Sequence, residues 1–231
     1  NCPEDKAHDL FKLPAYVEKM AENNWLGDKT KQGFYKKTKT AEGKTEILAL
    51  DLKTLEYRPQ QKVKSATLEL TKPIENVKDR MKVFATGKDK AAELFRASSF
   101  GLFEYVSDRI PEISDELYRI DDAMRAGFGW DLGPFELWDA VGIAAAIEGM
   151  KAYQHTPAAW VQEMLDAGHT TFYKVENGVK HYYDIPTKTY KALPGASDFV
   201  ILDNLRGNKT IWKNSGASII DLGDGILNVE F

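Results

Sequence analysis

The feature that most constrains this chain is a helix, a glycine-rich corner and a second helix within residues 121–142, DDAMRAGFGWDLGPFELWDAVG. Gly127 and Gly129 are predicted to turn the chain, because glycine adopts backbone angles that a Cβ forbids. Pro134 follows Gly133 and suits the first position of the second helix, where its missing N–H removes no hydrogen bond. The pattern therefore predicts two helices joined by a sharp turn.

The two predicted helices differ in how apolar they are. The incoming helix has apolar side chains at steps of three and four residues, which predicts one buried face. Those side chains are Ile110, Ile113, Leu117, Ile120 and Met124. The second helix is interrupted only by Glu136 and Asp139, so it is expected to be mostly buried. Asp139 is expected to hydrogen-bond across the corner, and the aromatic side chains are expected to fill a core.

The motif GWDLGPFELWDAVG at the corner resembles the signature of the C-terminal helical domain of NAD-dependent 3-hydroxyacyl-CoA dehydrogenases. The residues in register are Gly133, Pro134, Phe135, Glu136, Leu137, Asp139 and Gly142. The resemblance implies a mainly α fold whose domain follows a nucleotide-binding domain and helps to form the acyl-CoA cleft. It also implies oxidation of 3-hydroxyacyl-CoA to 3-oxoacyl-CoA with NAD in fatty-acid β-oxidation.

Two parts of the chain resemble each other in the same order. Residues 16–20 match 160–164, residues 34–36 match 172–174, and residues 51–57 match 184–190. Three ordered matches indicate an internal repeat. A helical block at about residues 76–152 precedes only the second copy, so the chain is expected to begin inside its first repeat and to be a fragment.

The first copy contains GDKTKQGFY at residues 27–35, which resembles the family's closing pattern Gly-x-Lys-Thr-x-x-Gly-Phe-Tyr. Its structural positions are Gly33, Phe34 and Tyr35. Lys29 is a candidate contact for a CoA phosphate, with a lysine that only fixes the loop as the alternative. The second copy, GHTTFY at residues 168–173, lacks the lysine and the inner glycine and is therefore degenerate.

Local signals place the remaining elements. Asn76 and Thr156 are predicted to cap helices. Hairpin turns are predicted at Glu42-Gly43, Asn177-Gly178 and Gly223-Asp224-Gly225. Residues 217–231, ASIIDLGDGILNVEF, are similar to the opening strands of an enoyl-CoA hydratase domain, which implies a bifunctional dehydrogenase and hydratase as the parent.

The predicted fold is mainly α, with helical repeats of the dehydrogenase C-terminal type, the first one truncated, and small β-hairpins. The expected segments are residues 1–60, the end of the first helical repeat with its closing hairpin, and residues 61–73, a connector. Residues 74–195 are expected to be a second, degenerate helical domain. Residues 196–231 are expected to be a linker and the first strands of a hydratase-like domain.

No catalytic, cofactor-binding or metal-binding residue is predicted. The glycine string at residues 127–133 follows a helix rather than a strand, and its third glycine is one residue late for dinucleotide binding. None of the histidines His8, His155, His169 and His181 lies in the family's histidine motif. One cysteine and scattered histidines give no zinc-ligand spacing. NAD is therefore expected to bind to an absent nucleotide-binding domain.

Bulk properties exclude several classes of protein. The 31 basic and 35 acidic residues give a formal charge of −4, without the basic excess typical of nucleic-acid-binding proteins. The longest apolar run, residues 140–147, is too short to span a bilayer, and no signal peptide is found at the start. The single cysteine, Cys2, forms no internal disulfide and fits a reducing compartment. A cytoplasmic protein without nucleic-acid or membrane partners is expected.

The expected partners are an acyl-CoA substrate, the preceding nucleotide-binding domain and the following hydratase-like domain. Two alternatives stay open. The first is a scaffold that joins domains or forms a homodimer through Trp138, Ala145 and neighbouring apolar surface. The second is a separate acyl-CoA-binding module.

Overall fold

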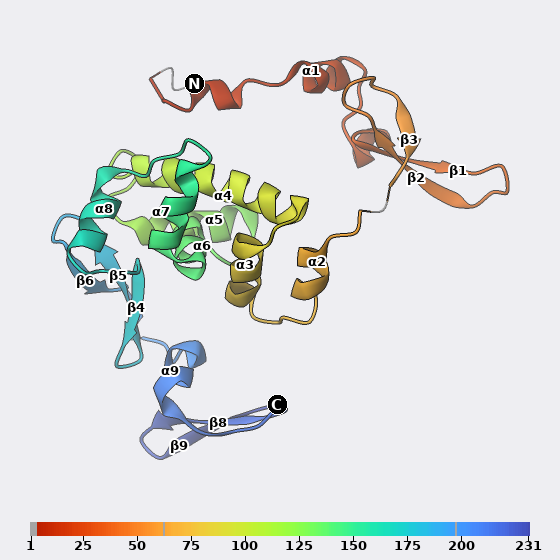
Figure 1. The fold of residues 1–231 in the computed structure, drawn as a ribbon. Helices are drawn as coiled ribbons and strands as arrows, with labels where there is room; N and C mark the ends of the chain where they lie inside the picture. The colour runs from red at the N-terminus through yellow and green to blue at the C-terminus, as the bar shows by residue number, and fades with distance from the viewer. Residues whose placement is uncertain (1–3, 62, 197) are drawn as a thin grey trace. The chain divides into compact units, whose positions relative to one another are not determined.

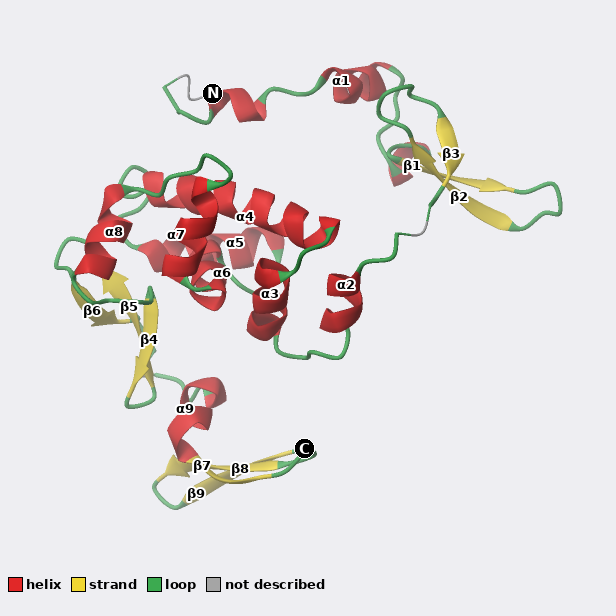
Figure 2. Cartoon of the chain, viewed as in Figure 1, coloured by secondary structure: helices red, strands yellow, loops and turns green. Residues whose placement is uncertain are grey.

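The computed structural model describes residues 4–61, 63–196 and 198–231. The chain divides into two compact units, residues 1–64 and 65–231. Helices and small three-stranded antiparallel sheets make up both units, and the long helices belong to the second (Figures 1 and 2). The mainly α prediction is therefore confirmed, although each predicted hairpin has a third strand.

The first unit is a short helix followed by a sheet. Its elements are η1 (His8–Phe11), α1 (Ala15–Glu22), η2 (Asp28–Thr30), β1 (Tyr35–Lys39), β2 (Thr45–Leu50) and β3 (Tyr57–Pro59). The strands pair antiparallel in the order β1-β2-β3. The predicted turn at Glu42-Gly43 joins β1 to β2, and Gly43 has a φ of +78° that favours glycine.

The second unit contains the helical block. Its helices are α2 (Ala66–Thr71), α3 (Val77–Thr86), α4 (Lys90–Asp108), α5 (Leu117–Phe128), α6 (Pro134–Val141), α7 (Ile143–Lys151) and α8 (Ala159–Asp166). Asn76 caps α3 as predicted, because its side chain accepts hydrogen bonds from the first amides of that helix. Helix α2 lies in the stretch predicted to be a connector, and Ser65 caps it by accepting from Leu68 N. The sequence did not predict this helix within the expected connector.

The start of α5 also differs from the prediction. The apolar spacing from Ile110 onward predicted one continuous helix, but α5 begins at Leu117. Pro111 lacks an N–H and restricts the residue before it, so the helix forms only after the proline. Ile113 is 67% exposed and does not belong to the buried face.

The glycines of the corner have different roles from those predicted. Gly129 ends α5 with a φ of +66°, as expected for the turn. Gly127 lies inside α5 and is helical, so its predicted role in the turn was wrong. Pro134 occupies the first position of α6, which confirms that prediction.

Helix α8 begins later than expected from the predicted cap at Thr156. Its first residue is Ala159, and its cap position, Ala158, has no capping side chain. Instead the Ser107 hydroxyl on α4 accepts from Ala158 N at 3.0 Å. A tertiary contact therefore replaces the local cap that the sequence suggested.

Helix α6 is the centre of the helical core and contacts α3, α4, α5 and α7. The rings of Phe103 on α4 and Trp138 on α6 stack with centroids 4.7 Å apart. Phe172 lies edge-on to Trp138 at 5.2 Å and to Phe135 at 5.0 Å. All four side chains are fully buried. Trp138 therefore cannot form the apolar surface on which the dimer alternative was based, although Ala145 is exposed.

A sheet closes the helical block. Its strands are β4 (Tyr173–Glu176), β5 (Val179–Asp184) and β6 (Thr189–Ala192), paired antiparallel in that order. The turn between β4 and β5 is Asn177-Gly178, with φ values of +51° and +79°. Both residues are in the left-handed region that a two-residue type I′ hairpin requires, so this prediction is confirmed.

The same three hydrogen bonds occur in the sheets of both units. In each unit, a backbone N–H just after the preceding helix donates to a carbonyl of that helix. An N–H of the second strand donates to the carbonyl of the residue just before the first strand. The hydroxyl of a tyrosine in the third strand donates to a backbone carbonyl of the closing loop. The donor and acceptor residues are Trp25 and Met20, Leu50 and Phe34, and Tyr57 and Gly33 in the first unit. They are His169 and Met164, Tyr183 and Phe172, and Tyr190 and Thr171 in the second.

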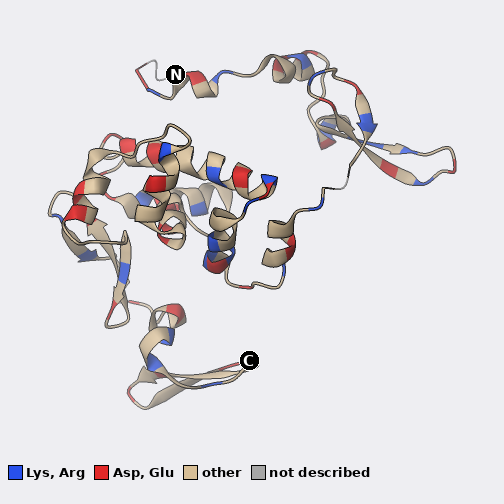
Figure 3. Cartoon of the chain, viewed as in Figure 1, with Lys and Arg blue, Asp and Glu red and all other residues tan. Residues whose placement is uncertain are grey.

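The last part of the chain contains α9 (Leu202–Lys209), β7 (Thr210–Lys213), β8 (Ser218–Gly223) and β9 (Ile226–Glu230). The hairpin predicted around Gly223-Asp224-Gly225 is confirmed by β8 and β9. Helix α9 and strand β7 were not predicted, since the two strand-like runs expected here correspond to β8 and β9. No helix among the described residues is long and apolar enough to cross a bilayer. Acidic and basic residues are mixed along the helices of the second unit (Figure 3).

Replacing Trp138 with alanine should destabilise the helical block strongly. The change removes a buried ring from the stack with Phe103 and leaves a cavity, so we expect the free energy of unfolding to fall by about 3–5 kcal/mol. Urea unfolding followed by circular dichroism measures this. Trp212→Ala, at a side chain that is 48% exposed, is the matched control and should change stability by about 0.5 kcal/mol or less. Equal losses in both variants would contradict the assigned core.

Candidate functional site

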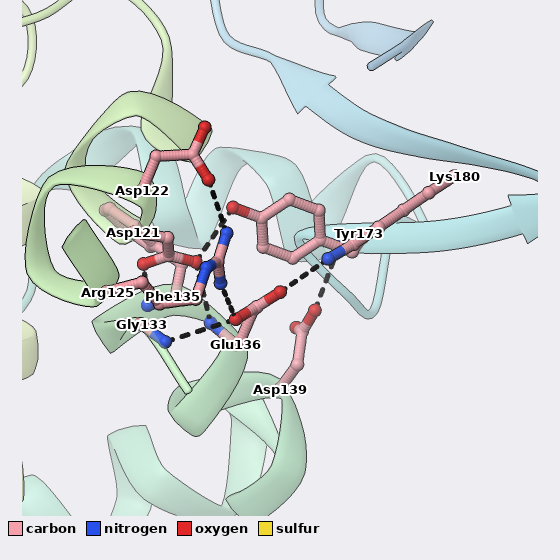
Figure 4. Close-up of polar contacts among 9 residues, drawn as sticks. All are labelled: Asp121, Asp122, Arg125, Gly133, Phe135, Glu136, Asp139, Tyr173 and Lys180. Carbon is pink, nitrogen blue, oxygen red and sulfur yellow. Dashed lines mark hydrogen bonds and ion pairs between the residues drawn. The ribbon is translucent and has the colours of Figure 1, made fainter. Parts of the chain in front are cut away.

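A cluster of charged and aromatic side chains joins α5, α6 and the strands β4 and β5 (Figure 4). Its members are Asp121, Asp122, Arg125, Gly133, Phe135, Glu136, Asp139, Tyr173 and Lys180. The cluster includes the start of α6, where the glycine corner ends. The geometry of the cluster decides what the motif does.

Asp121 is fully buried on α5 and accepts three hydrogen bonds. Its carboxylate accepts from Phe135 N at 2.9 Å, from Glu136 N at 3.1 Å and from the Tyr173 hydroxyl at 2.8 Å. The two amides are at the first turn of α6, where backbone N–H groups have no partner within the helix. Asp121 therefore caps α6 from a neighbouring helix.

Gly133 permits this close approach. A Cβ on Gly133 would lie 2.3 Å from the Cβ of Asp121, a distance that no side chain tolerates. Its φ is −71°, so the requirement for glycine is steric and does not come from the backbone angle. The glycine at this place in the motif is thus needed for the contact between α5 and α6.

Glu136 is the charged centre of the cluster. It accepts from Gly133 N at 3.1 Å and forms ion pairs with Lys180 of β5 and with Arg125 of α5. Burial raises its pKa, but the ion pairs with Lys180 and Arg125 outweigh that effect and hold the pKa below its ordinary value. Glu136 of α6 is therefore connected to both α5 and β5 by ion pairs. Arg125 also pairs with Asp122.

Asp139 connects α6 to the sheet rather than bonding across the corner as predicted. Its carboxylate accepts from Phe172 N at 2.7 Å and from Tyr173 N at 2.9 Å. The position across the corner is held by Asp121. Asp139 lies further along α6, where it meets the start of β4. Asp139 therefore forms hydrogen bonds, but the partner predicted for them was wrong.

The pKa values of Asp121, which is fully buried, and of Asp139, which is half-buried, are both shifted upward. Burial raises the pKa of Asp121 to about 7, although its three donors favour the ionised form. Burial also raises the pKa of Asp139 to about 7, and the negative charge of Asp121 adds to this. Burial and the neighbouring Asp121 likewise raise the pKa of the Tyr173 hydroxyl. These carboxyls therefore change protonation near neutral pH.

The hydrogen bonds of this cluster are made to the protein itself. Its carboxylates accept from backbone amides, a tyrosine and two cationic side chains of the same chain. Within the described residues, no group of three or more His, Cys, Asp or Glu side chains could hold a metal ion. The contacts of the cluster join α5, α6 and the sheet.

The cluster also shows why NAD does not fit this corner. A pyrophosphate needs free amides at the start of a helix that follows a strand. The first amides of α6 are already bonded to Asp121 and Glu136, and α5 rather than a strand precedes them. The glycine string at residues 127–133 therefore has no dinucleotide-binding geometry.

The remaining predicted positions belong to the first unit. A Cβ on Gly33 would lie 2.8 Å from Gly27 Cα, so glycine is required there for two backbone segments to cross. Phe34 and Tyr35 are 49% and 58% exposed, and Lys29 is exposed in η2.

The histidines of the second unit have structural contacts. His155 Nδ1 lies 2.6 Å from Glu104 Oε2, and the His169 ring packs against Tyr183 and Tyr190. His8 is in η1, and His181 Nδ1 lies 3.0 Å from the Val179 carbonyl. Cys2 lies outside the described residues.

Sequence reasoning missed the roles of Asp121, Arg125, Tyr173 and Lys180. One signal was available, because Asp121 follows the buried Leu117 by four residues and so lies on the apolar face of α5. An acidic residue on such a face indicates a buried acceptor with partners. The partners themselves come from distant parts of the chain, and no local pattern identifies them.

Asp121 should make stability depend on pH. Its folded pKa of about 7 exceeds its ordinary value of 3.8, so its stabilising effect is complete below about pH 4 and is lost as the pH rises through 7. We expect the advantage of the wild type over Asp121→Asn in unfolding free energy to shrink on the order of 2–4 kcal/mol between pH 4 and pH 8. Urea titrations at several pH values measure it.

Asp122→Asn is the control, since this neighbour forms only an exposed ion pair with Arg125. Its difference from the wild type should vary by about 1 kcal/mol or less over the same pH range. An advantage of the wild type over Asp121→Asn that grows with pH would instead mean that the three donors keep Asp121 ionised.

Comparison with known proteins gives this fold its family. Residues 102–182, which include the cluster, match the family described as 3-hydroxyacyl-CoA dehydrogenase, C-terminal domain. The chain is 41% identical over 224 residues to a Bacillus subtilis (strain 168) protein named "Probable 3-hydroxyacyl-CoA dehydrogenase". This alignment covers 96% of the chain and 28% of the relative.

Two more distant relatives are named as fatty acid oxidation complex trifunctional enzymes, from Rickettsia prowazekii and Rickettsia felis. Each is 27% identical over 133 residues, which are 58% of this chain and 17% of the relative. The chain thus spans less than a third of the length of these relatives. No solved structure matches it. The matched domain and the similarity over nearly the whole chain indicate the 3-hydroxyacyl-CoA dehydrogenase family.

Proposed function

We propose that this chain supplies the C-terminal helical region of an NAD-dependent 3-hydroxyacyl-CoA dehydrogenase of fatty-acid β-oxidation. The observation that carries the proposal is the 41% identity to the Bacillus subtilis protein over 96% of the chain. In this proposal NAD binds to a nucleotide-binding domain outside the present sequence, since the glycine corner has no free helix-terminal amides for a pyrophosphate. The protein acts in the cytoplasm on an acyl-CoA substrate.

The two units are, in this proposal, copies of one module. Residues 1–60 are the end of the first copy, and residues 74–195 are the second, degenerate copy. The recurrence of the same three hydrogen bonds in the sheet of each unit supports the repeat. A lysine also lies over the ring of the third-strand tyrosine in each unit: Lys36 over Tyr57 and Lys174 over Tyr190.

The individual residues have supporting rather than catalytic roles in this proposal. Gly133 and Asp139 hold α6 against its neighbours, while Gly33 closes the first copy. Lys29 is exposed, has the charge to contact a CoA phosphate, and is the substrate-binding candidate. The names of the Rickettsia relatives support a parent with several activities, in which residues 196–231 lead into a hydratase-like domain.

The test uses acetoacetyl-CoA and NADH. We expect no NADH oxidation by the purified chain alone, and oxidation when the chain follows a nucleotide-binding domain of this family. In the joined protein, Gly133→Ala should lower turnover at least about tenfold, equivalent to about 1.4 kcal/mol, because the new Cβ displaces α6 from Asp121. Gly127→Ala is the matched control, since its Cβ would meet no atom within 4 Å, and should keep full turnover.

Two outcomes would contradict the proposal. Oxidation of NADH by the isolated chain would mean that the nicotinamide site lies within it. Full turnover by the nucleotide-binding domain without the chain would mean that the helical region contributes nothing. A calorimetric titration with acyl-CoA distinguishes the alternatives, because saturable heat from the chain alone would favour a separate acyl-CoA-binding module over a scaffold.

A further inference from the structure

The first unit contains an apolar groove of about 200 Å³ between α1 and the loop before β1. Val17 and Met20 of α1 line one side, and Phe34 lines the other. Met20 is 5% exposed, but the ring of Phe34 is 49% exposed. A large apolar side chain with this exposure beside a groove indicates a surface that another segment covers.

The second unit shows what covers the same place. The residues that match Val17, Met20 and Phe34 are Val161, Met164 and Phe172, and all three are fully buried. Phe135 and Trp138 of α6 cover the Phe172 ring at 5.0 and 5.2 Å. The ring of Phe34 already has the matching orientation, edge-on to Tyr16 at 6.5 Å, as Phe172 is to Trp160 at 5.7 Å.

Backbone hydrogen bonding gives a second, independent match. In the second unit, Asp139 accepts from the amides of Phe172 and Tyr173. In the first unit, Leu50 N donates to the Phe34 carbonyl, so the next pair along the ladder, Tyr35 with Ala49, is not hydrogen-bonded. The amide of Tyr35 therefore points away from β2. Among the described residues, neither this amide nor that of Phe34 has an acceptor.

We infer that this groove and these two amides form a docking surface for a helical hairpin with the chemistry of α5 and α6. The hairpin places two aromatic side chains against Phe34, and a carboxylate of its second helix accepts from Phe34 N and Tyr35 N. The inference rests on the proposed repeat of one module. Helix α6 of this chain is not the occupant, because its Asp139 carboxylate already accepts from Phe172 N and Tyr173 N. Its Phe135 ring packs against Phe172.

The probe is a synthetic peptide of residues 117–151, which contains α5, α6 and α7. We expect it to bind the full ¹⁵N-labelled chain saturably and to shift the NMR amide signals of Phe34 and Tyr35. The peptide with Asp139→Asn should bind at least tenfold more weakly, because it loses a charged acceptor for two amides. The peptide with Glu148→Gln is the matched control and should bind equally, since Glu148 forms only an exposed ion pair.

The groove is tested from the side of the chain as well. Phe34→Ala should weaken binding of the peptide at least tenfold, whereas Ile211→Ala, at a side chain 61% exposed on β7, should leave it unchanged. Shifts centred on β7 to β9 would overturn the proposal. So would dimerisation of the chain through Phe34 without the peptide, because the surface would then serve a second copy.

A tethered version separates weak docking from poor folding of the free peptide. The same segment is joined before residue 1 by a flexible glycine and serine linker, which raises its effective concentration to the millimolar range. We expect amide hydrogen exchange at Phe34 and Tyr35 to slow at least tenfold, and to return to the untethered rate with Asp139→Asn in the added segment. Unchanged exchange in the tethered protein would overturn the docking surface while leaving the dehydrogenase proposal intact.

Discussion

Two carboxylates, one fully buried and one half-buried, join α5, α6 and the β4–β6 sheet by accepting hydrogen bonds from backbone amides. Asp121 of α5 accepts from the first turn of α6, and Asp139 of α6 accepts from the start of β4. Each hydrogen bond satisfies a backbone donor that its own helix or strand leaves unpaired. Removing an ionisable group from water is unfavourable, and the elevated pKa values of both aspartates reflect it.

The same two contacts explain why the sequence motif has its form. Gly133 is required because a Cβ would overlap Asp121, and Pro134 suits the first position of α6 because it needs no acceptor. Phe135 and Trp138 then face Phe172, whose backbone N–H donates a hydrogen bond to the Asp139 carboxylate. The motif is thus a device for fixing one helix between another helix and a sheet. In the proposed function, that rigidity, rather than chemistry at the corner, is what the helical region offers a 3-hydroxyacyl-CoA dehydrogenase.

The sequence predicted those features that depend on neighbouring residues. The cap at Asn76, the proline start of α6 and the hairpin at Asn177-Gly178 follow from local backbone chemistry, and all three are correct. The errors occur where distant segments decide. Ser107 replaced the predicted cap at Thr156, and Asp121 took the place across the corner that was assigned to Asp139. The family resemblance could also be identified from the sequence, because the residues of its motif are contiguous.

Amide hydrogen exchange at Phe172 and Tyr173 tests most directly whether carboxylate–amide bonds hold the helical block to its sheet. If they do, these two amides exchange among the slowest in the chain, and Asp139→Asn accelerates both while the turn at Asn177-Gly178 keeps its rate. Exchange at Phe172 and Tyr173 as fast as at that exposed turn in the unaltered protein would contradict the account.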